Sequence, residues 1–78
     1  MTSNAGSVAP SRGELDVMNL IAQGLKDQAI ANRLGISLVT VRRRAQQFRE
    51  RVGAKNRSEA VAIAAANRWI EVRGTAQG

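Results

Sequence analysis

The sequence of 78 residues predicts an all-α domain of four helices. Its apolar residues recur at intervals of three and four in four separate blocks, which is the spacing of helices that bury one face. No stretch alternates apolar and polar residues for long enough to predict a strand. We expect one folded domain over 11–72, between a flexible arm at 1–10 and a flexible tail at 73–78, because both ends are polar and lack periodicity.

The first helix is expected to begin after Ser11 and to stop at Gly24. Ser11 is a candidate N-cap, and Glu14, three residues later, would complete a capping box. Glycine commonly follows the last turn of a helix because it tolerates a positive φ. The apolar face of this helix is predicted to contain Leu15, Met18, Ile21 or Ala22, and Leu25.

A short second helix follows, with Asp27 as its candidate N-cap and Gly35 as its end. Its apolar stripe is predicted to be Ile30, Ala31 and Leu34. The turn from 34 to 37 contains the glycine, and the apolar Ile36 is expected to fill the corner between this helix and the next.

The third helix, over 38–52, is predicted to begin after the N-cap Ser37 and to end at Gly53. Its buried stripe steps regularly by three and four residues. The residues off this stripe must face solvent or a ligand, and they are rich in arginine and glutamine. The buried stripe is Leu38, Val41, Ala45, Phe48 and Val52.

A fourth helix is expected from Arg57 to about Asn67, with Asn56 and Glu59 spaced as a capping box. It carries more apolar surface than one buried face requires, which predicts a dimer seam. The alternative is that alanine is there as the best helix former. The predicted seam residues are Val61, Ala64, Ala65 and Arg68; Trp69 and Ile70 are expected to pack back onto the core.

Composition excludes several classes of function. The chain has no cysteine and no histidine, so disulfides, Cys/His zinc sites and the usual nucleophile and base pairs are excluded. Its few carboxylates show no paired spacing for acid/base work. We therefore expect neither an enzyme nor a metal or cofactor. No apolar run is long enough to span a membrane and no signal peptide is visible, so a cytoplasmic protein is expected.

The net charge of the chain favours a polyanion as its partner. Twelve Lys and Arg residues against six Asp and Glu residues give a net charge of +6. All the cations except Lys26 and Lys55 are arginines, the type suited to bidentate contacts with phosphate and guanine. Phe48 and Trp69 are the only aromatic residues, too few for a base-stacking platform. Double-stranded DNA is therefore favoured over single strands.

The second and third helices have the anatomy of a helix-turn-helix, with 38–52 as the recognition helix in the major groove. Arginine pairs with guanine and glutamine with adenine, so the predicted base-reading residues are Arg42, Arg43 and Gln46. An exposed, charged helix face that is merely solvated is the alternative. The predicted phosphate contacts are Ser37, Thr40, Arg44, Gln47 and Arg49.

The chain contains six motifs in order: ELDVM at 14–18, IAQGL at 21–25, IANRLGIS at 30–37, TVR at 40–42, VGA at 52–54 and RSEAV at 57–61. With these motifs the sequence resembles the LuxR/GerE-type DNA-binding domain without a gap from about 11 to 70. The resemblance implies a bacterial, nucleoid-associated transcriptional regulator, a four-helix fold, DNA contacts at Thr40, Arg42, Arg43 and Gln46, and pairing through the fourth helix. This chain departs from the family pattern at Gly13, Ala29, Arg44 and Arg49.

Two other classes of protein share parts of this pattern. Region four of a sigma factor shares the core of the motif, but the predicted helix after Gly53 argues against it. A protein-interaction module that pairs with and sequesters a larger regulator of the same family is the alternative from another class. The expected partners are double-stranded DNA and a second copy of the chain; RNA polymerase and a related regulator are further candidates.

Overall fold

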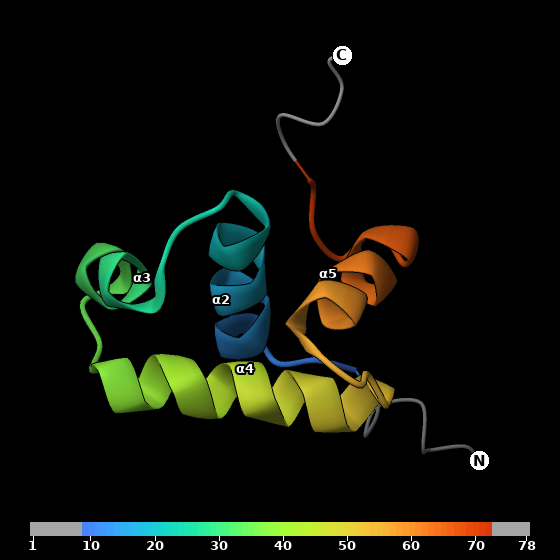
Figure 1. The fold of residues 1–78 in the computed structure, drawn as a ribbon, viewed down its shortest axis with the longest axis horizontal. Helices are drawn as coiled ribbons and strands as arrows, with labels where there is room; N and C mark the ends of the chain where they lie inside the picture. The colour runs from blue at the N-terminus through green and yellow to red at the C-terminus, as the bar shows by residue number, and fades with distance from the viewer. Residues whose placement is uncertain (1–8, 73–78) are drawn as a thin grey trace.

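The computed structural model describes residues 9–72, and these form four α-helices without a strand (Figure 1). The predicted all-α fold is thus confirmed for this part of the chain. Residues 1–8 of the predicted arm and the predicted tail at 73–78 lie outside the described residues. The helices are α2 at Arg12–Ala22, α3 at Asp27–Leu34, α4 at Leu38–Val52 and α5 at Arg57–Ala66.

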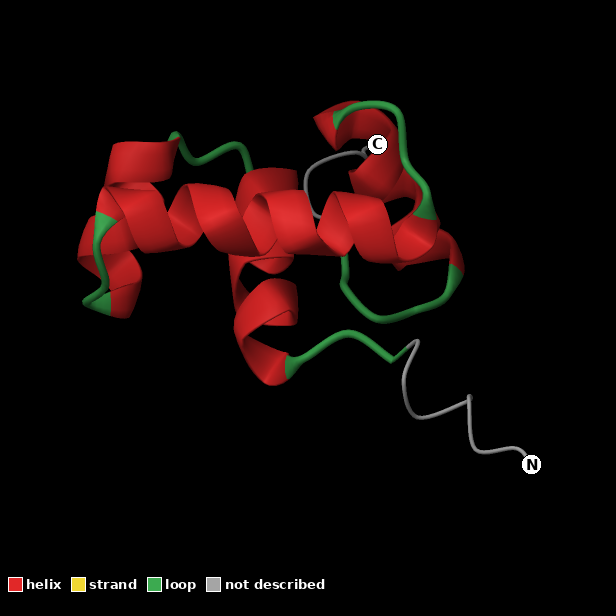
Figure 2. Ribbon diagram, turned by 90° about the horizontal axis from the view of Figure 1, so that it is seen from below, coloured by secondary structure: helices red, strands yellow, loops and turns green. Residues whose placement is uncertain are grey.

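The longest helix, α4, forms one side of the domain, and the other three helices all pack on the same side of it. Figure 1 shows α3 over the N-terminal end of α4, α2 over its middle and α5 over its C-terminal half. Seen from below in Figure 2, α4 crosses in front of the other helices along its length. One long face of α4 is therefore left uncovered.

Two apolar clusters hold these helices together, and α2 contributes to both of them. In α2 the predicted apolar face was incomplete, because Val17 and Leu20 are also buried and Leu15 is only partly covered. A central helix that packs on two sides needs more than one apolar face. The first cluster is Val17, Leu20, Ile30, Ala31, Val41 and Ala45; the second is Met18, Phe48, Ala60, Ala64 and Ile70.

Local signals at the helix ends act as the sequence predicted. The side chains of Ser11, Ser37 and Asn56 each accept a hydrogen bond from the backbone N–H three residues later. Gly35 and Gly53 follow α3 and α4 with φ of 69° and 72°, a left-handed conformation that a residue with a Cβ adopts at a cost.

Two predictions about acidic caps were wrong, and the capping box of Asn56 and Glu59 forms only in part, because the carboxylate of Glu59 accepts from the N–H of Lys55 at 2.6 Å. The N-cap of α3 is Lys26, and the carboxylate of Asp27 turns to Arg57, whose Nη1 and Nη2 donate to it at 2.7 and 3.1 Å. The carboxylate of Glu14 accepts two hydrogen bonds from Arg51, each of 2.9 Å, and does not complete a capping box. A forked guanidinium offers a carboxylate a stronger, charge-assisted pair than a backbone amide does.

The segment after α5 packs back onto the core, as predicted. The N–H of Trp69 donates to the carbonyl of Ala64 at 2.9 Å, and Arg68 adopts a φ of 61° to allow this turn. The ring of Trp69 then meets that of Phe48 edge-on, with centroids 6.1 Å apart, and Ile70 is buried in the second cluster.

None of the helices in the described range is long and apolar enough to cross a membrane. Within residues 9–72 there is also no group of three metal-binding side chains.

Candidate nucleic-acid interface

The uncovered side of α4 presents four exposed side chains, which we call the outward face: Val39, Arg43, Gln46 and Glu50. Successive residues of an α-helix are turned by about 100°, so these four positions lie opposite the buried stripe of α4. That stripe is centred on Val41, Ala45 and Phe48. Because α2, α3 and α5 all lie on the buried side, nothing in the described chain blocks access to the outward face.

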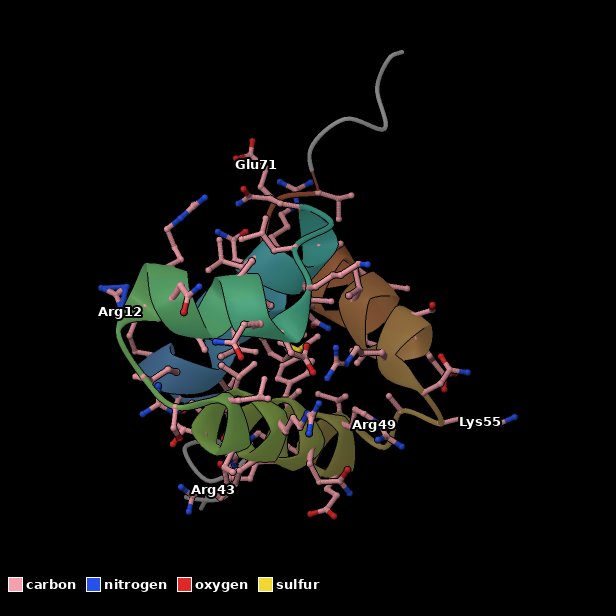
Figure 3. All side chains as sticks on the ribbon, turned by 60° about the vertical axis from the view of Figure 1, so that its left-hand side comes forward. Arg12, Arg43, Arg49, Lys55 and Glu71 are labelled. Carbon is pink, nitrogen blue, oxygen red and sulfur yellow. The ribbon has the colours of Figure 1, made fainter. Side chains whose placement is uncertain are left out.

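Arg43 lies at the centre of the outward face. Its side chain is exposed and makes no hydrogen bond or ion pair with any other residue in the described range. Figure 3 shows Arg43 pointing away from the rest of the domain. All its guanidinium donors are therefore available to an external acceptor.

Gln46, the second predicted reader on this face, is held in place by its neighbours. Its Nε2 donates to Glu50 at 2.8 Å, and its Oε1 accepts from Nη1 of Arg49 at 3.1 Å. A side-chain amide has two hydrogens and two lone pairs, so one of each remains for a ligand. The contacts fix the orientation of the amide without using it up.

Arg42, the third predicted reader, lies on the flank of α4 that faces α3. Its Nε is 3.5 Å from a carboxylate oxygen of Asp27, while 65% of the side chain stays exposed. The hydrogen bonds from Arg57, with Arg42 beside them, hold the pKa of Asp27 below its ordinary value. Asp27 thus links α3 to both α4 and α5. Sequence reasoning missed this role because the two arginines are distant in the chain.

Replacing Asp27 by asparagine is expected to lower the free energy of unfolding by about 1 kcal/mol at pH 7. Because the pKa of Asp27 is lowered on folding, its ion pairs stabilise the native state above the unfolded pKa of about 4. That contribution is lost as the pH falls through the lower, folded pKa. Urea denaturation between pH 7 and pH 2 should therefore show a weaker acid dependence in Asp27→Asn than in the native chain.

The control is Asp16→Asn, since Asp16 is exposed and forms no ion pair within the described residues. It should follow the native pH profile. If Asp27→Asn also followed that profile, the Asp27 ion pairs would not contribute to stability.

The opposite flank of α4 faces the start of α2 and carries Thr40, Arg44 and Gln47. Arg44 is half-buried and lies over Gly13, where an added Cβ would be 3.0 Å from its Cζ atom. At the start of the helix the hydroxyl of Ser37 donates to that of Thr40 at 2.9 Å. Thr40 accepts this bond and keeps its own hydroxyl hydrogen for another acceptor.

Arg49 was predicted to contact phosphate, and in the structure its guanidinium has two partners within the chain. Its Nη2 donates to the carbonyl of Lys55 at 3.2 Å, and Nη1 donates to Gln46. Its Nε is buried and has no partner among the residues described. In Figure 3, Arg49 lies on the side of α4 that leads to Lys55 and α5. It thus holds the loop after α4, and its predicted phosphate contact stays a prediction.

The predicted dimer seam needs one correction. Ala64 is fully buried in the second cluster, so in this fold it cannot touch a second chain. Val61 and Ala65 are half-buried and Arg68 is exposed, and these three positions stay a prediction. The most exposed alanines of α5 are Ala62 and Ala66.

Comparison with known proteins identifies similarity along most of the described chain. The model of the family described as "Bacterial regulatory proteins, luxR family" matches residues 11–64. "Transcriptional regulatory protein YdfI" of Bacillus subtilis is 47% identical over 51 residues, which are 65% of this chain and 24% of that protein. The chain thus spans about a quarter of the length of this relative. No solved structure matches the chain significantly.

Proposed function

This chain belongs to the luxR family of bacterial regulatory proteins, and from that membership we propose that it binds double-stranded DNA and regulates transcription with α4 in the major groove. Proteins of this family are DNA-binding regulators and not enzymes. The sequence-specific mode, the contact residues and the dimer argued below are parts of the proposal.

The observation that carries the proposal is the uncovered outward face of α4 with Arg43 unpaired at its centre. The major groove of B-DNA admits an α-helix, and a free guanidinium there can donate to O6 and N7 of guanine together. Five arginines and one glutamate in α4, within a chain of net charge +6, would attract the phosphates on either side of the groove.

The remaining proposed contacts come from Gln46 on the outward face, from the two flanks of α4 and from its N-cap. Arg42 would read a base from the side of α3, where Asp27 limits its position, and Gln46 would read an adenine with the hydrogen and lone pair it has left. Phosphate contacts are assigned to Ser37, Thr40, Arg44 and Gln47. Of the two hydroxyls, that of Thr40 is the better donor, because Ser37 already donates to it.

A homodimer through α5 would place two copies of α4 on a two-fold DNA site. Support comes from the small side chains on the outer side of α5 and from the half-buried Val61 and Ala65 beside them. Arg68 would lie at the edge of this interface. A selected DNA site with two inverted halves would agree with the dimer, whereas a single half-site would contradict it.

Selection of duplex fragments by the purified chain at several salt concentrations tests the function. A shared motif is expected, and Arg43→Ala should lower the affinity for it about 5- to 150-fold, since a bidentate contact is worth about 1–3 kcal/mol. The melting temperature should not fall, because the Arg43 side chain is exposed and makes no hydrogen bond or ion pair within the described residues.

The control is Lys26→Ala, which removes the same charge from the loop between α2 and α3. It should lower affinity only slightly and leave the motif intact. Binding that selects no motif and falls steeply with salt would reduce the interaction to its electrostatic part. The interaction with a larger regulator would then be the function to test.

A further inference from the structure

We propose that Val39 is a specificity-determining residue that contacts the methyl group of a thymine in the DNA site. This inference rests on the proposed function and extends it, because none of the polar contacts assigned above would detect that methyl group. It comes from the exposure of Val39, its position on the outward face and the chemistry of the major groove.

Val39 is unusually exposed for its residue type. The large apolar side chains classed as exposed in the described part of the chain are Val39, at 69%, and Trp69, at 36%. The position of Trp69 is explained by its ring contact with Phe48, whereas Val39 belongs to neither apolar cluster. Valine is also a weaker helix former than alanine, so Val39 does not serve the stability of α4.

The position of Val39 is that of a residue that meets DNA. It lies in the first turn of α4, one turn before Arg43 and two turns before Gln46, on the same face of the helix. Recognition helices contact base edges mainly with their N-terminal residues. Side chains of a helix also lean toward its N-terminus, which places Val39 at the leading edge of the outward face.

Valine has the right chemistry for one of the four bases. Its two methyl groups are nearly fixed in a helix, because branching at Cβ leaves one preferred rotamer. In the major groove the apolar group on a base edge is the C5 methyl of thymine, while the other readable groups are donors or acceptors. A valine at this place would bury its methyl groups favourably against the methyl group of thymine. Against another base it would cover donors or acceptors of the base edge without pairing them.

The spacing along α4 also places the thymine relative to the base read by Arg43. One helical turn advances about 5.4 Å, and base pairs are about 3.4 Å apart, so the two contacts lie one to two base pairs from each other. We therefore expect a thymine within two base pairs of the guanine read by Arg43, and again in the second half of a two-fold site.

The test removes the methyl group from the DNA and from the protein separately. Each thymine of the selected motif is replaced in turn by deoxyuridine, which lacks only that methyl, and affinities are measured for the native chain and for Val39→Ala. One position per half-site should lose about fourfold in affinity with the native chain. Val39→Ala should bind the natural motif about 4- to 10-fold more weakly and should be indifferent to the methyl at that position.

Val39→Ile is the conservative control and should keep the sensitivity to the methyl group. Neither variant should melt below the native chain, because the residue is exposed and alanine is the better helix former. If Val39→Ala and the native chain lost equal affinity at every deoxyuridine position, the inference would be overturned while the proposed function stood. If Arg43→Ala left binding unchanged and no motif emerged, the proposed function would fail and this inference with it.

Discussion

Replacing Arg51 by methionine is expected to lower the free energy of unfolding by about 3 kcal/mol, because it leaves the carboxylate of Glu14 buried without its partner. Glu14 is only 2% exposed, and Arg51 donates to both of its oxygens at 2.9 Å. Methionine keeps the apolar stem of the side chain and removes the charge. Urea denaturation followed by far-UV circular dichroism measures the loss.

The double variant Glu14→Leu with Arg51→Met distinguishes the effect of an unpaired buried charge from that of a packing defect. It should recover most of the lost stability, since two apolar side chains leave no carboxylate unpaired. Arg12→Met is the matched control, because Arg12 is an exposed arginine in the same turn of α2 as Glu14. A single variant Arg51→Met as stable as the native chain would show that the pair does not hold α2 on α4.

The helices themselves could be predicted because their signals are local. An N-cap lies three residues from the amide it satisfies, and a glycine lies directly after the helix that it ends. Ser11, Ser37, Asn56, Gly35 and Gly53 therefore marked the ends of helices without any knowledge of the fold. The burial of α4 followed from the regular spacing of its apolar residues.

The roles of the two buried or half-buried carboxylates could not be predicted in this way. Glu14 and Asp27 both stand where an acidic residue favours the start of a helix, so a local interpretation made them caps. Their actual partners, Arg51 and Arg57, are 37 and 30 residues away. Spacing in the sequence carries no information about which distant arginine a fold brings near.

The candidate site was predicted in composition but not in arrangement. Sequence spacing showed that the polar residues of α4 lie off its buried stripe, yet it could not say which of them the other helices engage. The structure separates Arg43, which is free, from Arg42, which pairs with Asp27, and from Arg49, which holds the next loop. It also joins two departures from the family pattern, because Arg44 occupies the space over Gly13.

The fourth helix shows why small residues are difficult to place from sequence. Alanine is favoured in helices whether it is exposed or buried, so the row of alanines in α5 predicted an exposed apolar surface that the structure only partly provides. The structure buries Ala60 and Ala64, which are one turn apart, against the cluster that contains Met18 and Phe48. Small side chains there let α5 approach the two large ones closely.

Phe48→Ala is expected to lower the free energy of unfolding by about 3–5 kcal/mol. Many small domains have no more stability than this, so much of the chain should be unfolded. Phe48 is fully buried and is the contact of Trp69, the only tryptophan, so loss of the fold should appear as a red shift of its fluorescence. Phe48→Leu keeps most of the volume and should cost about 1.5 kcal/mol. DNA binding should fall together with folding in Phe48→Ala, whereas Arg43→Ala should lose affinity while its fold persists. A native melting curve for Phe48→Ala would contradict this account, because it would mean that α5 and the segment after it do not depend on the second cluster for their place on α4.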